Sequence, residues 1–413
     1  MKFAEYRIAP EVKKNLENMG FRRPTDIQFK CIPPILKGED VLAIAQTGTG
    51  KTAAFAIPVV SILQNRKTSS RSLGVHCLVM APTHELAIQI YEVFKSIAEH
   101  TKVKVACIYG GVEQDPQIAQ LQKGVDILVA TPGRMFDLVS QQHLLLNNIE
   151  MLILDEADHM LDLGFLKDIQ QLVRKLPTNR QTLFFSATID EKIKKLAHSL
   201  VRNAIRIQIS PKNSVSKNVE HALAYIGMDD KRFFLERMIK ENPEHKLIVF
   251  VRTKVRAERV FKAMERVEIE SITIHSDKDQ KERESALNSF KTGKVKVLIT
   301  TDVSARGIDI PGVDMVINYD IPDKEDNYVH RVGRTGRGTN RGKAISFCSP
   351  EEKEEIAKIE EYIGQEIRVM EIDKTTYKET LILSDENFSD LNSMMKELEE
   401  MEEKKRKSQK RKR

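Results

Sequence analysis

The chain has 413 residues, of which 41% are hydrophobic and 31% are charged, enough apolar material for buried cores. At roughly 150 residues per domain, this length predicts two or three domains. No apolar run reaches the ~18 residues of a membrane-spanning helix, and no signal-peptide pattern opens the chain, so we expect a cytoplasmic protein. Four scattered cysteines without a Cys-x-x-Cys pair argue against a zinc site or a disulfide framework.

The formal net charge of +6 is concentrated at the C-terminus. The last ten residues, 404–413, hold eight lysines and arginines and no acid, so without them the net charge becomes −2. Such a run is usually a solvated, disordered arm. It can also hold nucleic-acid phosphates without sequence preference, with an affinity that falls steeply in salt. We expect a combination of the two.

A glycine-rich loop between a predicted strand at 41–44 and a predicted helix from 53 is the first strong motif. This order is the context of a P-loop, whose backbone N–H groups surround a β-phosphate at the positive end of the helix. Lys51 is placed to reach the β- and γ-phosphates, and the Thr52 hydroxyl is placed to ligate Mg²⁺. A flexible turn that happens to contain Gly-Lys-Thr is the alternative, but strand, loop and helix agree on a nucleoside triphosphate site. The residues expected to bind the nucleotide here are Thr47, Gly48, Thr49, Gly50, Lys51 and Thr52.

Predicted strands alternate with predicted helices from residue 41 onward, which indicates an α/β fold with mainly parallel sheets covered on both faces. We expect domain 1 at 1–209, a polar, proline-containing linker at 210–218, domain 2 at 219–370 and a C-terminal extension with the basic tail at 371–413. The predicted strands are 41–44, 77–80, 103–106, 127–129, 151–154 and 182–185, then 247–251, 272–275, 295–300 and 315–319; helical periodicity marks 85–98 and 189–200.

Acidic and hydroxyl side chains directly follow two of these strands. Ligands of parallel sheets bind outside the carboxyl ends of the strands. Asp155 after strand 151–154 is suited to hold Mg²⁺ through water, and Glu156 to orient and deprotonate the attacking water. Helix N-terminal charge is the ordinary alternative, but a P-loop in the same chain favours catalysis. Ser186 and Thr188 could link this acidic cluster to a moving partner, or simply cap a helix.

Together, these strings resemble the DEAD-box ATP-dependent RNA helicases of superfamily two, in which Asp155-Glu156-Ala157-Asp158 is the name-giving motif. The resemblance covers roughly residues 1–365 and implies two tandem RecA-like domains. Within the family, the short N-terminus and basic tail look most like bacterial RhlE-type members. The implied cofactors are ATP and Mg²⁺.

The resemblance assigns roles to further residues. Residues 20–28 look like the Q motif that selects adenine, which implies that Phe21 stacks on the base, Gln28 bonds its edge and Phe3 supports the site. The motif at 186–188 couples hydrolysis to unwinding, which implies coupling roles for Asp158, Ser186, Thr188 and His330. The strings at 81–87, 110–111, 131–134, 248–253 and 301–309 imply contacts to the RNA backbone by Pro82, Thr83, Gly110, Gly111, Thr131, Arg134, Arg252, Thr301 and Asp302.

Residues 330–337 are similar to the arginine-finger motif, which implies that Arg334 and Arg337 reach the γ-phosphate; Asp309 would reach the ribose. Lys51 and Mg²⁺ alone leave γ-phosphate charge uncompensated, and an arginine supplied from another domain adds ~10³ to 10⁵ in rate in such enzymes. A generic basic loop is the alternative. With an arginine finger, ATP would bridge the domains, and closure would complete a hydrolytic site and an RNA groove.

Two positions depart from the family pattern. His84 stands where arginine is usual, so a permanent cationic contact becomes conditional or is lost. Ser276 stands where glycine is usual. Neither belongs to the presumed catalytic set, so we expect activity with altered RNA affinity.

Three function classes follow: an RNA-dependent ATPase and helicase, which the motifs favour, a DNA translocase, and an RNA clamp or annealing chaperone. RNA contacts should be sequence-independent, through phosphate and sugar. We expect a monomer, with ribosomal precursors or RNA-decay machinery as the partners. Apolar residues at helical spacing after residue 390 predict a short surface helix, or a helix that binds a partner; they are Leu391, Met394, Met395, Leu398 and Met401.

Overall fold

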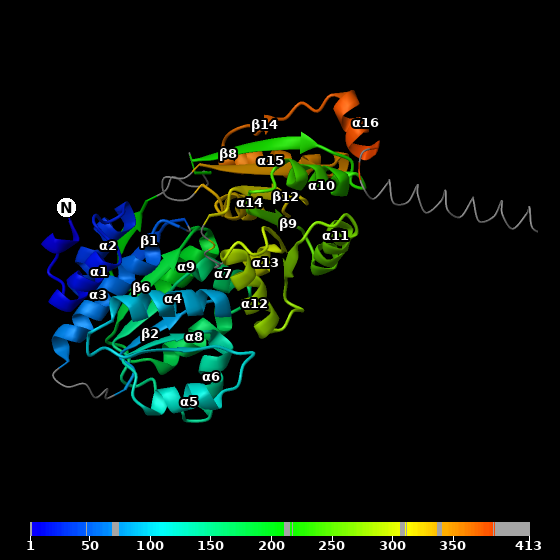
Figure 1. The fold of residues 1–413 in the computed structure, drawn as a ribbon. Coiled ribbons are helices and arrows are strands. Elements are labelled where there is room, and N and C mark those ends of the chain that lie inside the picture. Colours follow the sequence, from blue (N-terminus) through cyan, green and yellow to red (C-terminus); the bar gives the residue numbers. More distant parts are fainter. Residues whose placement is uncertain are drawn as a thin grey trace, which may run out of the picture. The chain divides into compact units, whose positions relative to one another are not determined.

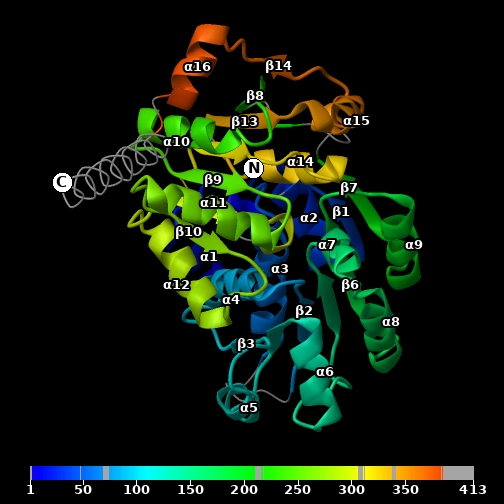
Figure 2. The ribbon, with the colours of Figure 1, turned by 90° about the vertical axis from the view of Figure 1, so that its right-hand side faces the viewer.

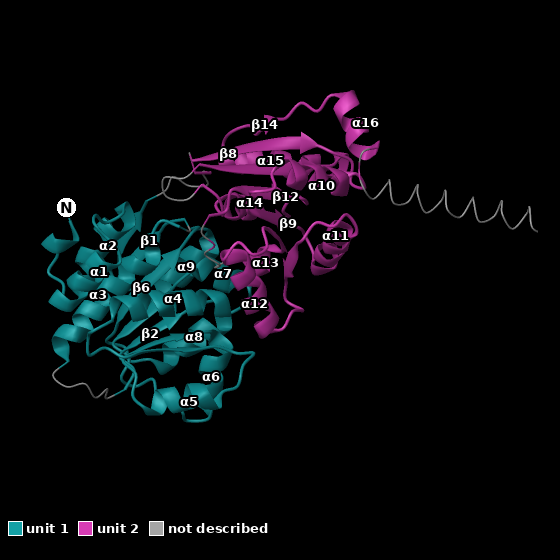
Figure 3. Ribbon diagram, in the orientation of Figure 1, with its two compact units in different colours: residues 1–214, 306–309 teal, residues 215–305, 310–413 magenta. Residues whose placement is uncertain are grey.

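The computed structural model describes residues 2–46, 48–67, 74–209, 215–216, 218–305, 310, 312–336, 341–382 and 384. Its two compact units are formed by the chain up to Ser214 and by most of the chain from Val215 onward (Figure 3). Among the described residues, each unit holds one seven-stranded sheet.

The first unit alternates short strands with helices (Figure 1). Its strands are β1 (Val41–Ile44), β2 (Cys77–Met80), β3 (Val105–Ile108), β4 (Ile127–Ala130), β5 (Met151–Leu154), β6 (Gln181–Ser186) and β7 (Ile205–Gln208). Its helices are η1 (Phe3–Glu5), α1 (Pro10–Asn18), α2 (Asp26–Leu36), α3 (Lys51–Arg66), α4 (His84–Ile97), α5 (Asp115–Gln122), α6 (Pro132–Ser140), α7 (Ala157–Asp162), α8 (Leu166–Lys175) and α9 (Glu191–Leu200).

The strand order of this sheet is β3-β4-β2-β5-β6-β1-β7, and every described pairing is parallel. Side chains alternate between its faces: Val41 and Ala43 join one apolar cluster, whereas Leu42 between them joins another. Both faces are therefore covered, and continuous apolar runs such as 151–154 are buried along their whole length.

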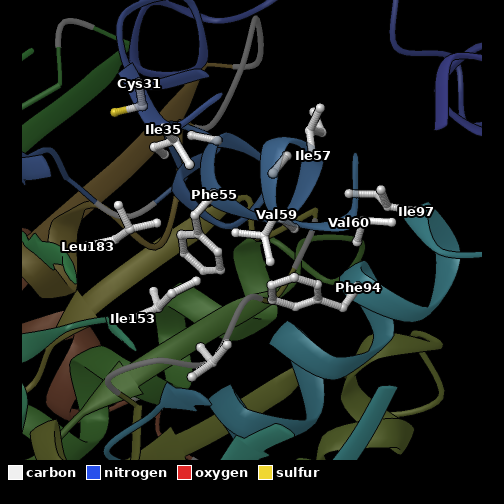
Figure 4. Packing of buried hydrophobic residues seen from close by; sticks show 14 of the residues in the cluster. Cys31, Ile35, Phe55, Ile57, Val59, Val60, Phe94, Ile97, Ile153 and Leu183 are labelled. Carbon is white, nitrogen blue, oxygen red and sulfur yellow. The ribbon is translucent and has the colours of Figure 1, made fainter. Parts of the chain in front are cut away.

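Helices α1 to α4 pack on one face of this sheet, and α6 to α9 pack on the other (Figure 2). On the first face, the Phe55 ring of α3 lies 5.8 Å from the Phe94 ring of α4 and 5.1 Å from the Phe185 ring of β6. Figure 4 shows this cluster, in which Phe55 lies next to Ile153 and Leu183 of the sheet. The packing fixes α3, and with it the loop that precedes α3, against the sheet.

The second unit repeats the alternation. Its strands are β8 (Val219–Tyr225), β9 (Leu247–Phe250), β10 (Ile272–Ile274), β11 (Val297–Thr300), β12 (Met315–Asn318), β13 (Gly342–Cys348) and β14 (Arg368–Val369). Its helices are α10 (Lys231–Glu241), α11 (Lys254–Arg266), α12 (Gln280–Lys291), α13 (Asp302–Ala305), α14 (Glu325–Val332), η2 (Pro350–Glu352), α15 (Lys353–Ile363) and α16 (Lys374–Ile382).

The strand order here is β10-β11-β9-β12-β13-β8-β14, again with parallel pairing throughout the described strands. Val249 and Ile299 join a cluster with apolar residues of α10 and α11. Tyr377 of α16 packs on the same side, with its ring 4.9 Å from the ring of Phe234. The chain beyond residue 370 therefore continues onto α10, although the sequence pattern predicted only an extension there.

The predicted fold class is confirmed: both sheets are parallel and flanked by helices. Ten predicted strands correspond to observed strands, with shifts of up to two residues, as at β3. Four observed strands, β7, β8, β13 and β14, were not predicted. In the described part of the chain, no helix is both long and apolar enough to cross a membrane. The basic tail and the apolar residues after 390 lie outside the described residues.

Candidate active site

Three candidate nucleotide motifs emerge from adjacent strands of the first sheet. The glycine loop follows β1, the acidic motif follows β5, and the Ser186-to-Thr188 motif begins at the end of β6. Strands β5, β6 and β1 are neighbours in the sheet. Because these strands are parallel, their carboxyl ends lie at one edge, and the topology places all three motifs there.

The glycine loop is held by backbone conformations that suit glycine. Gly48 and Gly50 have φ values of 80° and 92°, and Gly50 is the N-cap of α3. A Cβ atom on Gly50 would lie 2.6 Å from Nε2 of Gln28. Gln28 donates from this atom to the Gly50 carbonyl oxygen at 3.2 Å and accepts from the Thr25 backbone N–H at 3.0 Å. The adenine candidate Gln28 thus contacts the loop directly; Thr47 lies outside the described residues.

The two aromatic residues that are predicted at the adenine site lie next to each other. Phe3 is buried, and its ring packs edge-on against the Phe21 ring with centroids 5.9 Å apart. Phe21 is half-buried and so keeps part of its surface accessible. An edge-on aromatic neighbour holds a stacking ring in place, which fits the supporting role predicted for Phe3.

Lys51 and Asp155 form the charged centre of the site. Lys51 is buried, and its Nζ donates to the Ala45 carbonyl oxygen at 2.9 Å. Burial raises the pKa of Asp155 to about 7, although the nearby Lys51 charge acts to lower it. A divalent cation beside this carboxylate would compensate the lost hydration. Asp155 and the half-buried Thr52 at the start of α3 therefore fit the oxygen ligands that Mg²⁺ prefers.

Glu156 has an unusual backbone conformation for a non-glycine residue, with φ of 51° and ψ of 52°. It is buried and precedes α7, so the chain turns sharply between β5 and that helix. Left-handed conformations of this kind carry strain, which concentrates at functional sites. This geometry fits the role of a held general base.

Asp158 joins the acidic motif to the motif at 186–188. Its Oδ2 accepts from the backbone N–H of Ala187 at 3.1 Å, and from the backbone N–H and the hydroxyl of Thr188 at 2.9 and 3.0 Å. The Ser186 hydroxyl is buried, with no hydrogen-bond partner among the described residues. A shift of either segment would thus be transmitted to the other through the Asp158 carboxylate.

The RNA candidates of the first unit follow the strands on the other side of β5. Strands β3, β4 and β2 are neighbours. The segments that follow them contain Gly110–Gly111, Thr131 with Arg134 in the first turn of α6, and Pro82 with Thr83. The same edge of the sheet thus carries both predicted sets.

Side-chain contacts tie these loops together. Arg134 donates from Nη2 to the Val112 carbonyl oxygen at 2.7 Å, while its Nη1 is buried without a hydrogen-bond partner in the described part of the chain. The ring of His84, the residue that stands where the family usually has arginine, lies 5.5 Å from the Tyr109 ring. His84 also borders Gly110, because a Cβ atom on Gly110 would lie 3.6 Å from Nε2 of His84. Thr83 caps α4 by accepting from the Leu86 N–H at 3.3 Å.

In the second unit, two RNA candidates are engaged in internal ion pairs. Arg252, which follows β9, pairs through Nε with Asp323 at 2.9 Å and through Nη2 with Glu352 at 3.4 Å. Asp302, at the start of α13, accepts both prongs of the Arg331 guanidinium, at 2.6 and 2.8 Å. Thr301, immediately before Asp302, remains half-buried. An RNA contact by Arg252 or Asp302 would have to share or replace these partners.

Arg334, one of the two predicted arginine fingers, lies just after the end of α14. Arg334 is buried and donates from Nε to the carbonyl oxygen of His330, the coupling candidate, at 3.2 Å. Arg337 and the ribose candidate Asp309 lie outside the described residues. No role was predicted for Arg331, which is 1% exposed and thus more buried than Arg334, the other described arginine of this motif. Its position inside 330–337 was the only available signal.

Comparisons with known proteins agree with this arrangement. One family model, described as DEAD/DEAH box helicase, matches residues 25–196, and another, described as helicase conserved C-terminal domain, matches 230–339. The chain is 38% identical to the DEAD-box ATP-dependent RNA helicase RhpA of Helicobacter pylori over 370 residues, covering 90% of this chain and 74% of RhpA. It is 40% identical to the ATP-dependent RNA helicase RhlB of Shewanella frigidimarina over 377 residues, covering 90% of this chain and 87% of RhlB.

Among solved structures, S. cerevisiae Dbp5 bound to RNA and ADP BeF3 matches with a TM-score of 0.82 at 31% identity. The match covers 92% of this chain and 99% of the Dbp5 chain. The predicted tandem RecA-like fold and the predicted family are thereby confirmed, while the narrower RhlE-type placement stays a prediction. The chain belongs to the DEAD-box family of ATP-dependent RNA helicases.

Proposed function

We propose that this helicase separates short RNA duplexes, or remodels RNA–protein complexes, by closing its two units on ATP and RNA and reopening after hydrolysis. The observation that carries the proposal is the single sheet edge of the first unit. There the nucleotide candidates follow β5, β6 and β1, and the RNA candidates follow β3, β4 and β2. ATP and RNA bound side by side at one edge can be coupled by movements of the same loops.

In this proposal, ATP binds with its base on Phe21 and Gln28 and its phosphates on the loop before α3. Lys51 neutralises phosphate charge, and Mg²⁺ held by Thr52 and Asp155 would supply further charge neutralisation. The contact between Gln28 and Gly50 supports this step, because it connects the predicted base site to the phosphate loop within hydrogen-bond distance.

Hydrolysis requires a base for the attacking water. Glu156 takes the proton of the water that attacks the γ-phosphate, and Arg334 and Arg337 stabilise the charge that develops there. The inference is supported by the burial of Glu156, which excludes bulk water, and by its fixed backbone.

The RNA is held through its backbone, so its sequence matters little. We infer that ribosomal precursors or RNA-decay intermediates are the substrates, that the protein works as a cytoplasmic monomer, and that the basic tail adds a salt-sensitive phosphate anchor. A relative supports the first point: the ATP-dependent rRNA helicase RRP3 of Eremothecium gossypii is 39% identical over 375 residues.

The direct test is Glu156→Gln, which keeps the size of the side chain and removes the base. We expect RNA-stimulated ATP hydrolysis to fall by about 10² to 10⁴, with ATP and RNA binding retained. The matched control is Glu17→Gln on the exposed surface of α1, which should hydrolyse ATP at the wild-type rate.

Stimulation of ATP hydrolysis by RNA and by DNA of the same sequence is measured in parallel. Equal stimulation by both would show indifference to the 2′-hydroxyl and would favour a DNA translocase. Wild-type hydrolysis by Glu156→Gln would refute the assigned chemistry.

A further inference from the structure

A buried histidine without a role in the proposed hydrolysis lies beside the proposed base. His159 belongs to α7 and is only 3% exposed. Neither Nδ1 nor Nε2 of its ring has a hydrogen-bond partner among the residues that the structure describes. A neutral imidazole always carries one N–H and one acceptor nitrogen. Its burial therefore leaves two unsatisfied polar atoms.

The carboxylate of Glu156 lies beside this ring. Nδ1 of His159 lies 3.6 Å from Oε2 of Glu156, the residue that caps the N-terminus of α7. This separation is a few tenths of an ångström longer than a hydrogen bond. Catalytic hydrogen bonds are often long in the absence of substrate and tighten when it binds.

Packing does not account for the imidazole. Met160, which follows His159, and Ala157, two positions before it, are fully buried in the apolar cluster of the second sheet face, so this turn of α7 packs mainly through apolar side chains. A buried polar group without a partner costs stability, whereas an apolar side chain of similar size at the same place does not. The histidine is thus a feature that lowers stability next to the reactive group.

We propose that His159 is a positioning residue, whose Nδ1–H donates to Oε2 of Glu156 when ATP and RNA are bound and fixes that carboxylate toward the attacking water. The inference rests on the proposed role of Glu156 as the base. His159 keeps its proton throughout: the proton of the water goes to Glu156, and the imidazole only orients the carboxylate that accepts it. The strained backbone of Glu156 sets the direction of the side chain, and the imidazole sets its rotation.

The test uses full-length protein and three substitutions at one position. His159→Leu keeps an apolar volume and removes both nitrogens. His159→Asn places an amide N–H close to the position of Nδ1, whereas His159→Gln places one close to Nε2. We expect His159→Leu to lower kcat of RNA-stimulated ATP hydrolysis about ten- to a hundredfold, with KM for ATP and the Kd for RNA within about twofold. His159→Asn should restore most of kcat, and His159→Gln should restore less.

Thermal unfolding distinguishes positioning from packing. Because His159→Leu removes two unsatisfied buried atoms, its melting temperature should equal or exceed that of the wild type while its kcat falls. A kcat within twofold of the wild type, or a loss that follows a lower melting temperature and is not restored by His159→Asn, would overturn the proposal.

A double substitution separates this inference from the assignment of the base. With Glu156→Gln in place, His159→Leu should cause no further loss in single-turnover hydrolysis, since the group on which it acts is already gone. If both losses multiply instead, His159 acts elsewhere and the proposal is wrong. If Glu156→Gln hydrolyses ATP normally, the proposed base is wrong; if it is inactive while His159→Leu is normal, only the role of His159 fails.

Discussion

At the scale of single residues, both backbone conformation and side-chain contacts position the residues that are predicted to bind the nucleotide. Gly50 and Glu156 both have positive φ values, 92° and 51°. At Gly50 this conformation comes with a close approach, because the Gln28 amide occupies the space that a Cβ would need. The loop and the predicted adenine contact are therefore fitted to each other.

This fit predicts the effect of Gly50→Ala. A left-handed conformation costs an L-residue roughly 1–2 kcal/mol, and here the new methyl group also displaces Gln28. We expect at least a tenfold weaker affinity for a fluorescent ATP analogue and a lower melting temperature. Gly38→Ala is the control, since Gly38 has φ of 82° but open space around its Cβ position. It should lower the melting temperature and leave the affinity unchanged; equal affinities for both variants would contradict a contact between Gln28 and the loop.

The sequence predicted most residues of the candidate site but not the residues with which they form hydrogen bonds and ion pairs. The spacing of motifs after strands placed Lys51, Asp155 and Asp158 at one edge, and the link from Asp158 to Thr188 follows from that placement. The ion pairs of Arg252 with Asp323 and Glu352 could not be foreseen, because residues up to 100 positions apart meet only in the folded unit. The isolation of the His159 ring was hidden for the same reason.

At the scale of elements, a buried charge pair joins α10 to η2 in the second unit. Lys231 is fully buried, and its Nζ donates to Glu352 at 2.5 Å and to the Tyr319 carbonyl oxygen at 2.8 Å. Glu352 also accepts from the backbone N–H of Ile321 and from Arg252. One carboxylate thus anchors η2, the loop after β12 and the RNA candidate that follows β9.

We predict that Glu352→Ala lowers the free energy of unfolding at pH 7 by about 3–5 kcal/mol, since it leaves a buried ammonium unpaired. Burial already lowers the pKa of Lys231 below its usual 10.5, and Glu352 opposes that shift. Between the lowered pKa and 10.5 the unfolded chain binds more protons than the native one, so stability rises with pH there. Without Glu352 the pKa of Lys231 in the native state falls further, so the pH range in which stability rises begins at a lower pH.

The deficit of Glu352→Ala relative to the wild type should therefore shrink between pH 7 and pH 9.5 in chemical denaturation. Glu244→Ala is the control, because Glu244 pairs with Lys296 at the surface, where its side chain is 87% exposed. It should be close to the wild type at both values of pH. A deficit of Glu352→Ala that is unchanged or larger at pH 9.5 would show that Lys231 is not the group left unpaired.

Predicted elements were accurate where the pattern was strong. Strands β8 and β13 were missed although most of their residues are buried, whereas the missed edge strands β7 and β14 have little pattern of their own. Runs of apolar residues identified β1, β2 and β5 with their observed bounds. Strand β7 was missed because only Ile207 of its four residues is buried. Strand β14 is two exposed residues, and its pairing with β8 defines it. Such edge strands depend on a neighbour far away in the sequence and carry little periodicity of their own.

At the scale of the whole molecule, the candidate machinery is divided between the two units. The glycine loop, the proposed base and six of the nine RNA candidates belong to the first unit, whereas Arg252, Thr301, Asp302 and Arg334 belong to the second. In the proposed mechanism, the finger arginine and the general base come from different units, so ATP and RNA must bring the units to one defined arrangement before hydrolysis.

The most direct measurement is single-molecule fluorescence transfer between one dye on each unit. Exposed positions serve as label sites, Glu99 with Glu244 in one variant and Lys167 with Glu361 in another, all changed to cysteine; Cys107, the one natural cysteine that is not fully buried, is replaced by serine. With a non-hydrolysable ATP analogue and RNA together, the proposed closure predicts a shift to one narrow transfer distribution in at least one pair, which neither ligand alone produces. Distributions that are the same in both pairs with and without the two ligands would contradict it.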